Sequence, residues 1–342
     1  MRFKRILVTG GAGFIGSAFI RYGLAHLPLE KIVNVDLLTY AGHQKNMSDF
    51  LPDFRHDFFR GNICDTVFIK QLCQKHNIEA IVHFAAESHV DRSIANPSSF
   101  LETNVYGTFS LLEVVRELPH LHFHHVSTDE VYGSLQNGYF NENSTYRPNS
   151  PYAASKAASD HFVRAWGHTY GLSTTMSHCT NNYGPYQHAE KFIPHMIMNC
   201  LAAKPLPVYG EGINVRDWLF VDDHVEALWM ILEKGKAGEV YDIGGETEMR
   251  NIDLLHTLID CLAPRLSQSA EKLRSLITFV TDRPGHDLRY AIDCSKIKKE
   301  LGWTQRHTLP QGLEKTVAWY LYSNRVETLD LDRAKAPADQ QL

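Results

Sequence analysis

The chain has 342 residues, 44% of them hydrophobic, which is enough for one large domain or two lobes around a full core. A formal charge of −5 and a pI near 6.4 offer no basic surface to nucleic acid or to an anionic membrane. No apolar run approaches the roughly 18 residues of a membrane-spanning helix. The six cysteines are scattered without Cys-x-x-Cys spacing, so we expect a cytoplasmic protein.

A glycine-rich turn near the start predicts a dinucleotide site. Lys4–Thr9 is predicted to be a strand, Gly10, Gly13 and Gly16 follow it, and a helical pattern comes next. Glycines at this spacing make a tight turn and let the backbone approach a pyrophosphate, which the helix N-terminus then binds. A glycine loop that only turns the chain is the alternative.

An acidic residue ends the second predicted strand, which runs over 31–35. This residue, Asp36, lies twenty positions beyond Gly16. It can accept hydrogen bonds from the adenosine ribose hydroxyls and repel a 2′-phosphate, which favours NAD over NADP.

Strand and helix patterns alternate through the rest of the first half. Strands are predicted at 54–60 and 80–84, and helices at 65–76, 98–118 and 151–170. Helices between strands indicate a Rossmann-type, doubly wound parallel sheet that binds ligands at its carboxyl edge. The last two helices are apolar on more than one face, so they pack either on their own sheet alone or also against a second subunit.

Three reactive side chains, Thr128, Asp129 and Glu130, follow a further predicted strand. Two neighbouring carboxyls in a partly dry cleft do not both ionise readily, so one holds a proton while the other stays basic. Such an acid–base pair is suited to the elimination of water. In the alternative, one carboxylate caps a helix or pairs with Arg92 or Arg147.

Tyr152 and Lys156 are four positions apart and share one face of a predicted helix. A tyrosine acts as a base near neutrality only if its pKa falls from about 10 to about 7, a change of roughly 4 kcal/mol. One cation about 4 Å away supplies about that much, and Lys156 is placed to be that cation. The pair suits removal of a proton from an alcohol whose hydride leaves for NAD.

Three histidines alternate along the strand that leads to these acids: His120, His122 and His124. No carboxylate or cysteine at ligand spacing accompanies them, so we predict no metal, although a metal site is the alternative.

The second half is less regular. We expect a turn-rich segment at 181–186, a helix to about residue 203, an extended loop at 204–210 and a helix over 221–233. Residues 1–180 should form the NAD-binding domain with the catalytic groups, 181–325 mainly a smaller substrate-binding α/β lobe, and 326–342 a loosely held polar tail.

A basic cluster in this half is a candidate diphosphate clamp, because guanidinium groups match phosphate oxygens. It consists of Arg216, Arg283, His286 and Arg289. In the alternative, some of these residues form ion pairs with neighbouring aspartates.

Motifs from Arg5 to about Tyr322 resemble the nucleotide-sugar 4,6-dehydratases of the extended short-chain dehydrogenase/reductase superfamily, and most of all those that act on dTDP-glucose. They are TGGAGFIGS, NVDLLTYAG, FAAESHVDRS, STDEVYG, SPYAASKAASDH, TNNYGPYQ, EKFIP, PLPVYGEG, NVRDWLFVDDH and DRPGHDLRYAID. The glycine and Tyr-x-x-x-Lys motifs are common to the superfamily. The Thr-Asp-Glu run is specific, because epimerases and decarboxylases of this fold typically lack its acids.

The resemblance implies a reaction with no net redox change, which yields a 4-keto-6-deoxy sugar nucleotide and water. Tyr152 would deprotonate the glucose 4-hydroxyl, beside Thr128, as the C4 hydride passes to NAD. Glu130 would take the C5 proton and Asp129 would protonate the C6 hydroxyl, before the hydride returns to C6. A homodimer is also implied. A UDP-glucose dehydratase, a related epimerase, and a non-catalytic NAD-binding sensor or scaffold are the alternatives.

The resemblance also assigns binding residues by matching motif. For NAD they are Gly10, Gly13, Phe14, Ile15, Gly16, Asp36, Leu37, Leu38, Thr39, Asn62, Ile63, Phe84, Ala85, Ala86, Thr103, Tyr152, Lys156 and Asn182. For the nucleotide sugar they are Ser88, Thr128, Asn181, Lys191, Phe192, Pro207, Val208, Tyr209, Arg216, Asn251, Arg283, His286 and Tyr290.

Two positions depart from the family pattern. Asn62 stands where relatives usually have Asp; its carbonyl can still accept from the adenine amino group, so we expect weaker binding at most. His178 stands where relatives often carry another polar residue, and the sequence assigns it no role.

Overall fold

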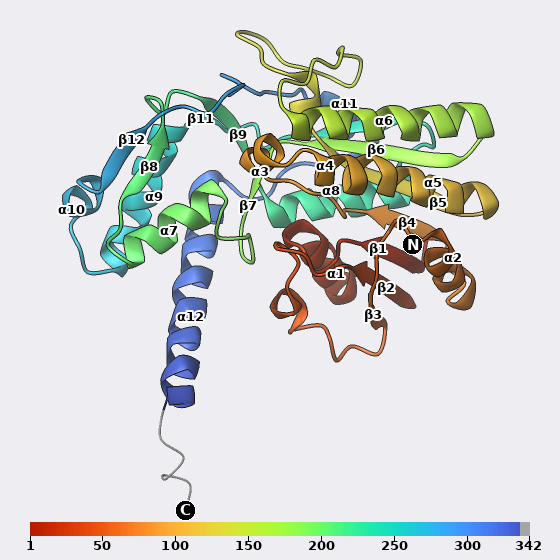
Figure 1. Ribbon diagram of the computed structural model, residues 1–342, viewed down its shortest axis with the longest axis horizontal. Coiled ribbons are helices and arrows are strands. Elements are labelled where there is room, and N and C mark those ends of the chain that lie inside the picture. Colours follow the sequence, from red (N-terminus) through yellow and green to blue (C-terminus); the bar gives the residue numbers. More distant parts are fainter. Residues whose placement is uncertain (336–342) are drawn as a thin grey trace, which may run out of the picture.

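A seven-stranded parallel sheet forms the centre of the protein, in the order β10-β6-β5-β4-β1-β2-β3 (Figure 1). The structure is a computed structural model that describes residues 1–335, with side chains to residue 323. The strands are β1 Arg5–Thr9, β2 Lys31–Asp36, β3 His56–Arg60, β4 Ala80–His83, β5 His122–Thr128, β6 Ser173–Cys179 and β10 Val240–Ile243. This order and the parallel pairing confirm the Rossmann-type fold.

Helices cover both faces of this sheet, which explains why β1 is apolar on both sides. In β1, Ile6 and Val8 face one hydrophobic cluster and Leu7 faces another. The first cluster includes Phe19 of α1 and Trp229 of α8, whose rings stack with centroids 4.1 Å apart. The helices of this face are α1 Phe14–His26 and α8 Val221–Lys234; α2 Thr66–Lys75, α5 Gly107–Glu117 and α6 Pro151–Tyr170 contribute to the second cluster.

The helix predicted over 98–118 is helical throughout but not uniform. It begins as α4 Ser98–Phe100, continues as the π-helical segment η2 Leu101–Tyr106, and ends as α5. A wide turn of this kind is common at functional sites, and its residue Thr103 lines the cavity described below.

A smaller lobe adjoins the carboxyl edge of the sheet (Figure 1). Its strands form a three-stranded sheet, β11-β9-β7, and a two-stranded sheet, β12-β8. Their bounds are β7 Asn181–Tyr183, β8 Leu206–Tyr209, β9 Val215–Phe220, β11 Glu248–Arg250 and β12 Ile277–Val280. Its helices are α7 Phe192–Leu201, α9 Asn251–Arg265, α10 Ala270–Arg274 and α12 Leu309–Lys335.

Two predicted connections of the second half were wrong. The loop expected at 204–210 contains β8, and the turn-rich segment at 181–186 begins with β7. Pro207 made the first of these segments look like a loop in the sequence. Proline is nevertheless tolerated in a strand with a free edge, and β8 has such an edge because it belongs to a two-stranded sheet with β12. The second strand is only three residues long.

The chain returns to the large sheet after entering the smaller lobe. Helix α8 packs on α1, β10 pairs with β6, and the short helix α11 Ser295–Leu301 adds Ile297 and Leu301 to the same core. We therefore propose that the chain divides into its two lobes after residue 180, except that α8, β10 and α11 belong to the first lobe.

The predicted polar tail, 326–342, is helical over its first part, because α12 continues to Lys335. The rest of that tail lies outside the described residues. Helix α12 projects from the smaller lobe away from the rest of the protein (Figure 1). Within residues 1–335, no helix is both long and apolar enough to cross a bilayer.

Candidate active site

A cavity of about 400 Å³ opens at the carboxyl edge of the central sheet. The glycine turn, Asp36, the Tyr152–Lys156 pair and the acids after β5 all line it. Residues that are far apart in sequence therefore meet at the edge where a parallel sheet binds ligands.

The turn between β1 and α1 has room only for glycine. Gly10 has a φ of +74°, and a Cβ there would lie 2.5 Å from the Ala85 nitrogen. A Cβ on Gly16 would lie 2.3 Å from the Gly10 carbonyl oxygen. Gly13 is the N-cap of α1, so no side chain occupies the N–H groups of the first helical turn. This cradle fits a pyrophosphate.

The carboxylate of Asp36 is fixed at the end of β2. Its Oδ2 accepts from the Ala12 N–H at 3.0 Å and its Oδ1 from the Leu38 N–H at 2.8 Å. Lone pairs that remain on both oxygens fit ribose hydroxyls. Leu38 packs its side chain on the core and is the one residue of our NAD set that does not line the cavity. Asn62, the departure from the family pattern, lines it and accepts from the Cys64 N–H at 2.9 Å.

Asp129 is 2% exposed and begins the 3-10 turn η3, Asp129–Tyr132. Its Oδ1 lies 3.4 Å from the Thr128 hydroxyl, and its Oδ2 has no partner among the described residues. Burial and the nearby Glu130 carboxylate raise the pKa of Asp129 well above its ordinary value. Both effects favour the protonated form of Asp129.

Glu130 lies in a more positive environment. Burial raises its pKa, but Arg283, Arg216 and Lys191 oppose that rise. The two neighbouring acids thus have unequal surroundings, which suits Asp129 as the acid and Glu130 as the base. The alternative pairing with Arg92 is not realised, because Arg92 Nε binds Glu190 at 3.1 Å.

Tyr152 and Lys156 lie on one face of α6 and line the cavity, as the spacing predicts. Burial and the Glu130 carboxylate raise the pKa of Tyr152 well above its ordinary value, and only the Thr128 hydrogen bond among the main influences lowers it. The lowering that we expected from Lys156 is therefore not seen. Burial lowers the pKa of Lys156 to about 8, and its Nζ donates to the Val126 carbonyl at 2.9 Å.

The basic cluster gathers near Glu130, with one exception. Arg216 is buried, donates to the Asp287 carbonyl at 2.9 Å and lies 4.3 Å from the centre of the Tyr290 ring. Arg283 Nη1 lies 3.6 Å from Asp91. Arg289 takes the alternative foreseen for this cluster, since it forms an ion pair with Glu248 at 2.6 Å and lies over the Tyr139 ring.

The other residues assigned to the nucleotide sugar divide between the two lobes. Ser88, Thr128, Asn181 and Lys191 line the cavity, and the Lys191 ammonium donates to the Ser88 carbonyl at 2.8 Å. His286 binds Asp282 at 2.6 Å, and the Tyr209 hydroxyl donates to Asp91 at 3.2 Å. Phe192, Pro207 and Asn251 belong to elements of the smaller lobe. Val208 is 1% exposed in that lobe's core, which does not favour its predicted contact with the nucleotide sugar.

The alternating histidines of β5 are part of the core. His122 and His124 are both buried, and each has a ring nitrogen 2.9 Å from the Thr175 hydroxyl. His120 precedes the strand. No group of three or more metal-binding side chains occurs within the described part of the chain.

Several residues at the cavity were missed in the sequence. Glu87, Tyr40, His188 and Glu190 line it, and the Arg92 guanidinium lies 3.9 Å from the centre of the Tyr40 ring. Glu87, Tyr40 and Glu190 lie within the motifs FAAESHVDRS, NVDLLTYAG and EKFIP, which could have pointed to them. His188 directly follows the motif TNNYGPYQ, and its place at the cavity depends on tertiary packing.

Comparison with known proteins shows the family to which this arrangement of side chains belongs. The family described as GDP-mannose 4,6 dehydratase matches residues 7–316. A dTDP-glucose 4,6-dehydratase from Salmonella typhimurium is 48% identical over 336 residues, covering 93% of this chain and 92% of the relative. The chain belongs to the dTDP-glucose 4,6-dehydratase family.

Solved structures agree with this family. A dTDP-glucose 4,6-dehydratase from Streptomyces venezuelae, crystallised with NAD, is 46% identical, has a TM-score of 0.89, and covers 94% of this chain and 98% of its own. A UDP-glucose 4-epimerase from Thermotoga maritima has a TM-score of 0.83 but only 27% identity, over 94% and 99% of the two chains. The expected dehydratase family, the fold and NAD as cofactor are confirmed.

Proposed function

We propose that this protein converts dTDP-glucose to dTDP-4-keto-6-deoxyglucose and water. The observation that carries the proposal is the presence of two unlike catalytic pairs in one cavity. Tyr152 and Lys156 serve an alcohol oxidation, whereas Asp129 and Glu130 serve the elimination of water. A simple dehydrogenase or epimerase has no use for the second pair.

The side chains divide the proton transfers between them. Tyr152 takes the proton of the glucose 4-hydroxyl, and the Lys156 ammonium stabilises the phenolate that forms. The 4-ketone acidifies C5, whose proton passes to Glu130. Asp129, which already holds a proton, gives it to the departing C6 hydroxyl. Thr128 donates a hydrogen bond near O4.

A bound NAD would supply the acceptor for the C4 hydride and the donor of that hydride to C6. C5 would then be reprotonated by the proton that Glu130 had taken from it. The glycine cradle and Asp36 are suited to hold its pyrophosphate and its adenosine ribose. On the substrate side, Lys191, Arg216 and Arg283 give the diphosphate a positive environment, since these cations already surround Glu130.

An assay on the pure protein tests this proposal. Incubated with dTDP-glucose and NAD, it should yield a product lighter by one water, which mass spectrometry detects. UDP-glucose is run in parallel. Dehydration of UDP-glucose alone would reassign the base specificity, a change of sugar configuration without loss of mass would indicate an epimerase, and no product from either would leave an NAD-binding sensor or scaffold.

We further propose a cytoplasmic homodimer. Leu101 and Tyr106 are 59% and 54% exposed on the segment that leads into α5, which supports burial against a second copy. All six cysteines are unpaired, as in a reducing compartment. Sedimentation velocity should give twice the 38.9 kDa chain mass, and Tyr106→Glu should give monomer. A wild-type monomer would contradict the dimer, and recovery in a membrane or secreted fraction would contradict the location.

A further inference from the structure

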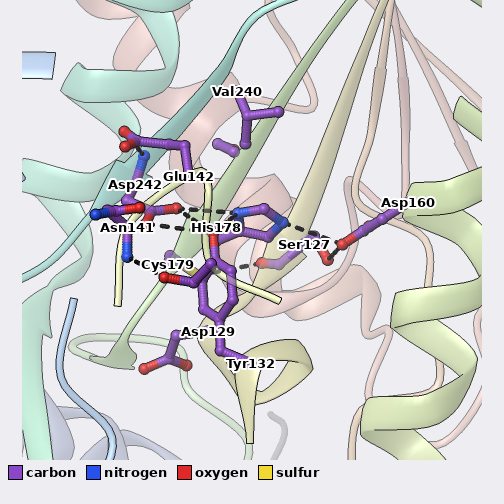
Figure 2. Close-up of polar contacts among 12 residues, drawn as sticks. Ser127, Asp129, Tyr132, Asn141, Glu142, Asp160, His178, Cys179, Val240 and Asp242 are labelled. Carbon is purple, nitrogen blue, oxygen red and sulfur yellow. Dashed lines mark hydrogen bonds and ion pairs between the residues drawn. The ribbon is translucent and has the colours of Figure 1, made fainter. Parts of the chain in front are cut away.

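His178, to which the sequence assigns no role, lies at the centre of a buried polar network behind the catalytic groups. It is 1% exposed on β6. Its Nε2 lies 3.0 Å from Asp160 Oδ2, and its Nδ1 lies 3.0 Å from Asp242 Oδ1. Figure 2 shows the ring between the two carboxylates. Because an ionised carboxylate only accepts hydrogen bonds, both ring nitrogens must carry protons.

The charge of this imidazolium follows from its partners. Burial alone would lower the pKa of His178, but the hydrogen bonds to Asp160 and Asp242 outweigh it and raise the pKa to about 10. The hydroxyls of Tyr132 and Tyr146 lie 2.9 Å from Nδ1 and Nε2, respectively. His178 is therefore a fixed positive charge in the core.

One side of the network holds the helix that carries the Tyr–Lys pair. Asp160 lies on α6, four residues after Lys156 and eight after Tyr152, and so on the same helix face. Its Oδ2 also accepts from the Ser127 hydroxyl at 2.9 Å, directly before Thr128 (Figure 2). The Asp160–His178 contact thus joins α6 to β6 and to the end of β5.

The other side holds the turn that carries the acids. Tyr132 is the last residue of η3, and its hydroxyl donates to Asp242 Oδ1 at 3.0 Å while it lies beside His178 Nδ1. Asp242, on β10, is fixed in turn, since its N–H donates to Glu142 Oε1 at 3.1 Å. The turn is therefore held at its far end by the same imidazolium that holds α6.

We infer that His178 is a positioning residue that fixes the Tyr152–Lys156 helix face and the Asp129–Glu130 turn relative to one another. This inference rests on the proposed dehydratase function. Oxidation and elimination act on adjacent sugar carbons, so the two catalytic pairs have to keep fixed positions relative to one another.

Replacing His178 should displace the two catalytic pairs relative to one another while their four side chains remain present. In His178→Gln, one amide cannot satisfy both carboxylates, and their mutual repulsion moves η3 or α6. Misplacement by about 1 Å costs up to about 10²-fold in rate, so kcat should fall about 10- to 100-fold with a much smaller change in KM. His122→Gln is the matched control, because His122 is equally buried but bonded to the Ser173 and Thr175 hydroxyls.

The experiment uses NAD-loaded protein and expresses every rate per NAD-containing site, so that misfolded protein does not count. Single-turnover reduction of NAD by dTDP-glucose reports on Tyr152, and exchange of the C5 proton with solvent reports on Glu130. We expect the exchange to slow more than the oxidation in His178→Gln, and the double variant His178→Gln/Asp242→Asn, which removes both charges of one pair, to recover part of the loss.

Two results would overturn the inference. One is a His178→Gln variant whose rates per site stay within about twofold of His122→Gln. The other is a double variant whose rate falls by the product of the factors measured for His178→Gln and for Asp242→Asn. That result would mean that the two charges act independently. Absence of any product from the wild-type protein would instead contradict the proposed function.

Discussion

At the residue scale, chemistry is decided by the surroundings of each group more than by its type. Asp129 and Glu130 are adjacent carboxyls, yet Asp129 is buried beside another acid and Glu130 faces three cations. This asymmetry separates an acid from a base within one turn of chain. It also predicts which step fails when either is changed.

Asp129→Asn and Glu130→Gln should both lose dehydration while they keep NAD and the first oxidation. Each removes one proton transfer, which is worth about 10²–10⁴-fold in rate. Adding dTDP-glucose should therefore reduce bound NAD, while the product lighter by one water forms at least about 10²-fold more slowly. A Glu130→Gln variant with wild-type turnover would remove the basis for the dehydratase assignment.

Tyr152→Phe should block the first oxidation, because the 4-hydroxyl loses its base. We expect a loss of about 10²-fold or more in NAD reduction during a single turnover. Tyr183→Phe is the control, since that tyrosine is buried in the smaller lobe and its hydroxyl donates to the Leu309 carbonyl at 3.4 Å. If Tyr152→Phe still reduced bound NAD at the control's rate, another group would be the base.

The first oxidation should slow as the pH rises through about 8. Burial lowers the pKa of Lys156 to about 8, so the ammonium is present below that pH and is lost above it. Loss of this charge removes the electrostatic stabilisation of the Tyr152 phenolate. Lys156→Arg keeps its charge, so its decline should move to higher pH even if its rate is lower throughout. An unmoved decline would show that Lys156 does not set it.

At the scale of single elements, the turn between β1 and α1 is specified by close approach. A Cβ on Gly16 would meet the Gly10 carbonyl oxygen at 2.3 Å and the Gly11 Cα at 2.9 Å. Neither atom belongs to a flexible side chain, so the backbone has to move. The tight spacing of the motif is thus a requirement of helix packing as well as of phosphate binding.

Gly16→Ala should lower the free energy of unfolding by about 1–3 kcal/mol, as overpacking does, and reduce the NAD content of the purified protein. Gly138→Ala is the control for the NAD content only. A Cβ there has nothing within 4 Å, but the φ of +81° makes alanine costly in stability far from the cradle. Urea unfolding and absorbance of released NAD measure the two effects. Equal NAD content in both variants would argue against the cradle.

Strands β1 to β5 of the large sheet were predicted from the sequence, whereas β6, β10 and the strands of the smaller lobe were not. In β1 the apolar run Ile6–Val8 leads directly to the glycine turn, and helix patterns separate the predicted strands. β8 contains Pro207, and β7 is three residues long. Short edge strands of this kind take their conformation from tertiary pairing and leave little local signal.

At the scale of the whole molecule, two features depended on contacts between distant segments. β10 joins the large sheet after the chain has entered the smaller lobe, which no local pattern announces. His178 was unexplained in the sequence because Asp160 and Asp242, its partners, lie 18 and 64 residues away. The motifs pointed to the candidate catalytic side chains, whereas the contacts that fix the positions of those side chains became visible only in the structure.

The most direct test of this account follows one hydrogen atom through the reaction. With dTDP-glucose carrying deuterium at C4, the transient oxidation should move the label to C6 while water leaves. Mass spectrometry should find a product lighter by one water that still holds the deuterium, now at C6. A product that has lost the deuterium, or one that keeps both the label and the full mass of the substrate, would contradict the proposed sequence of oxidation, elimination and hydride return.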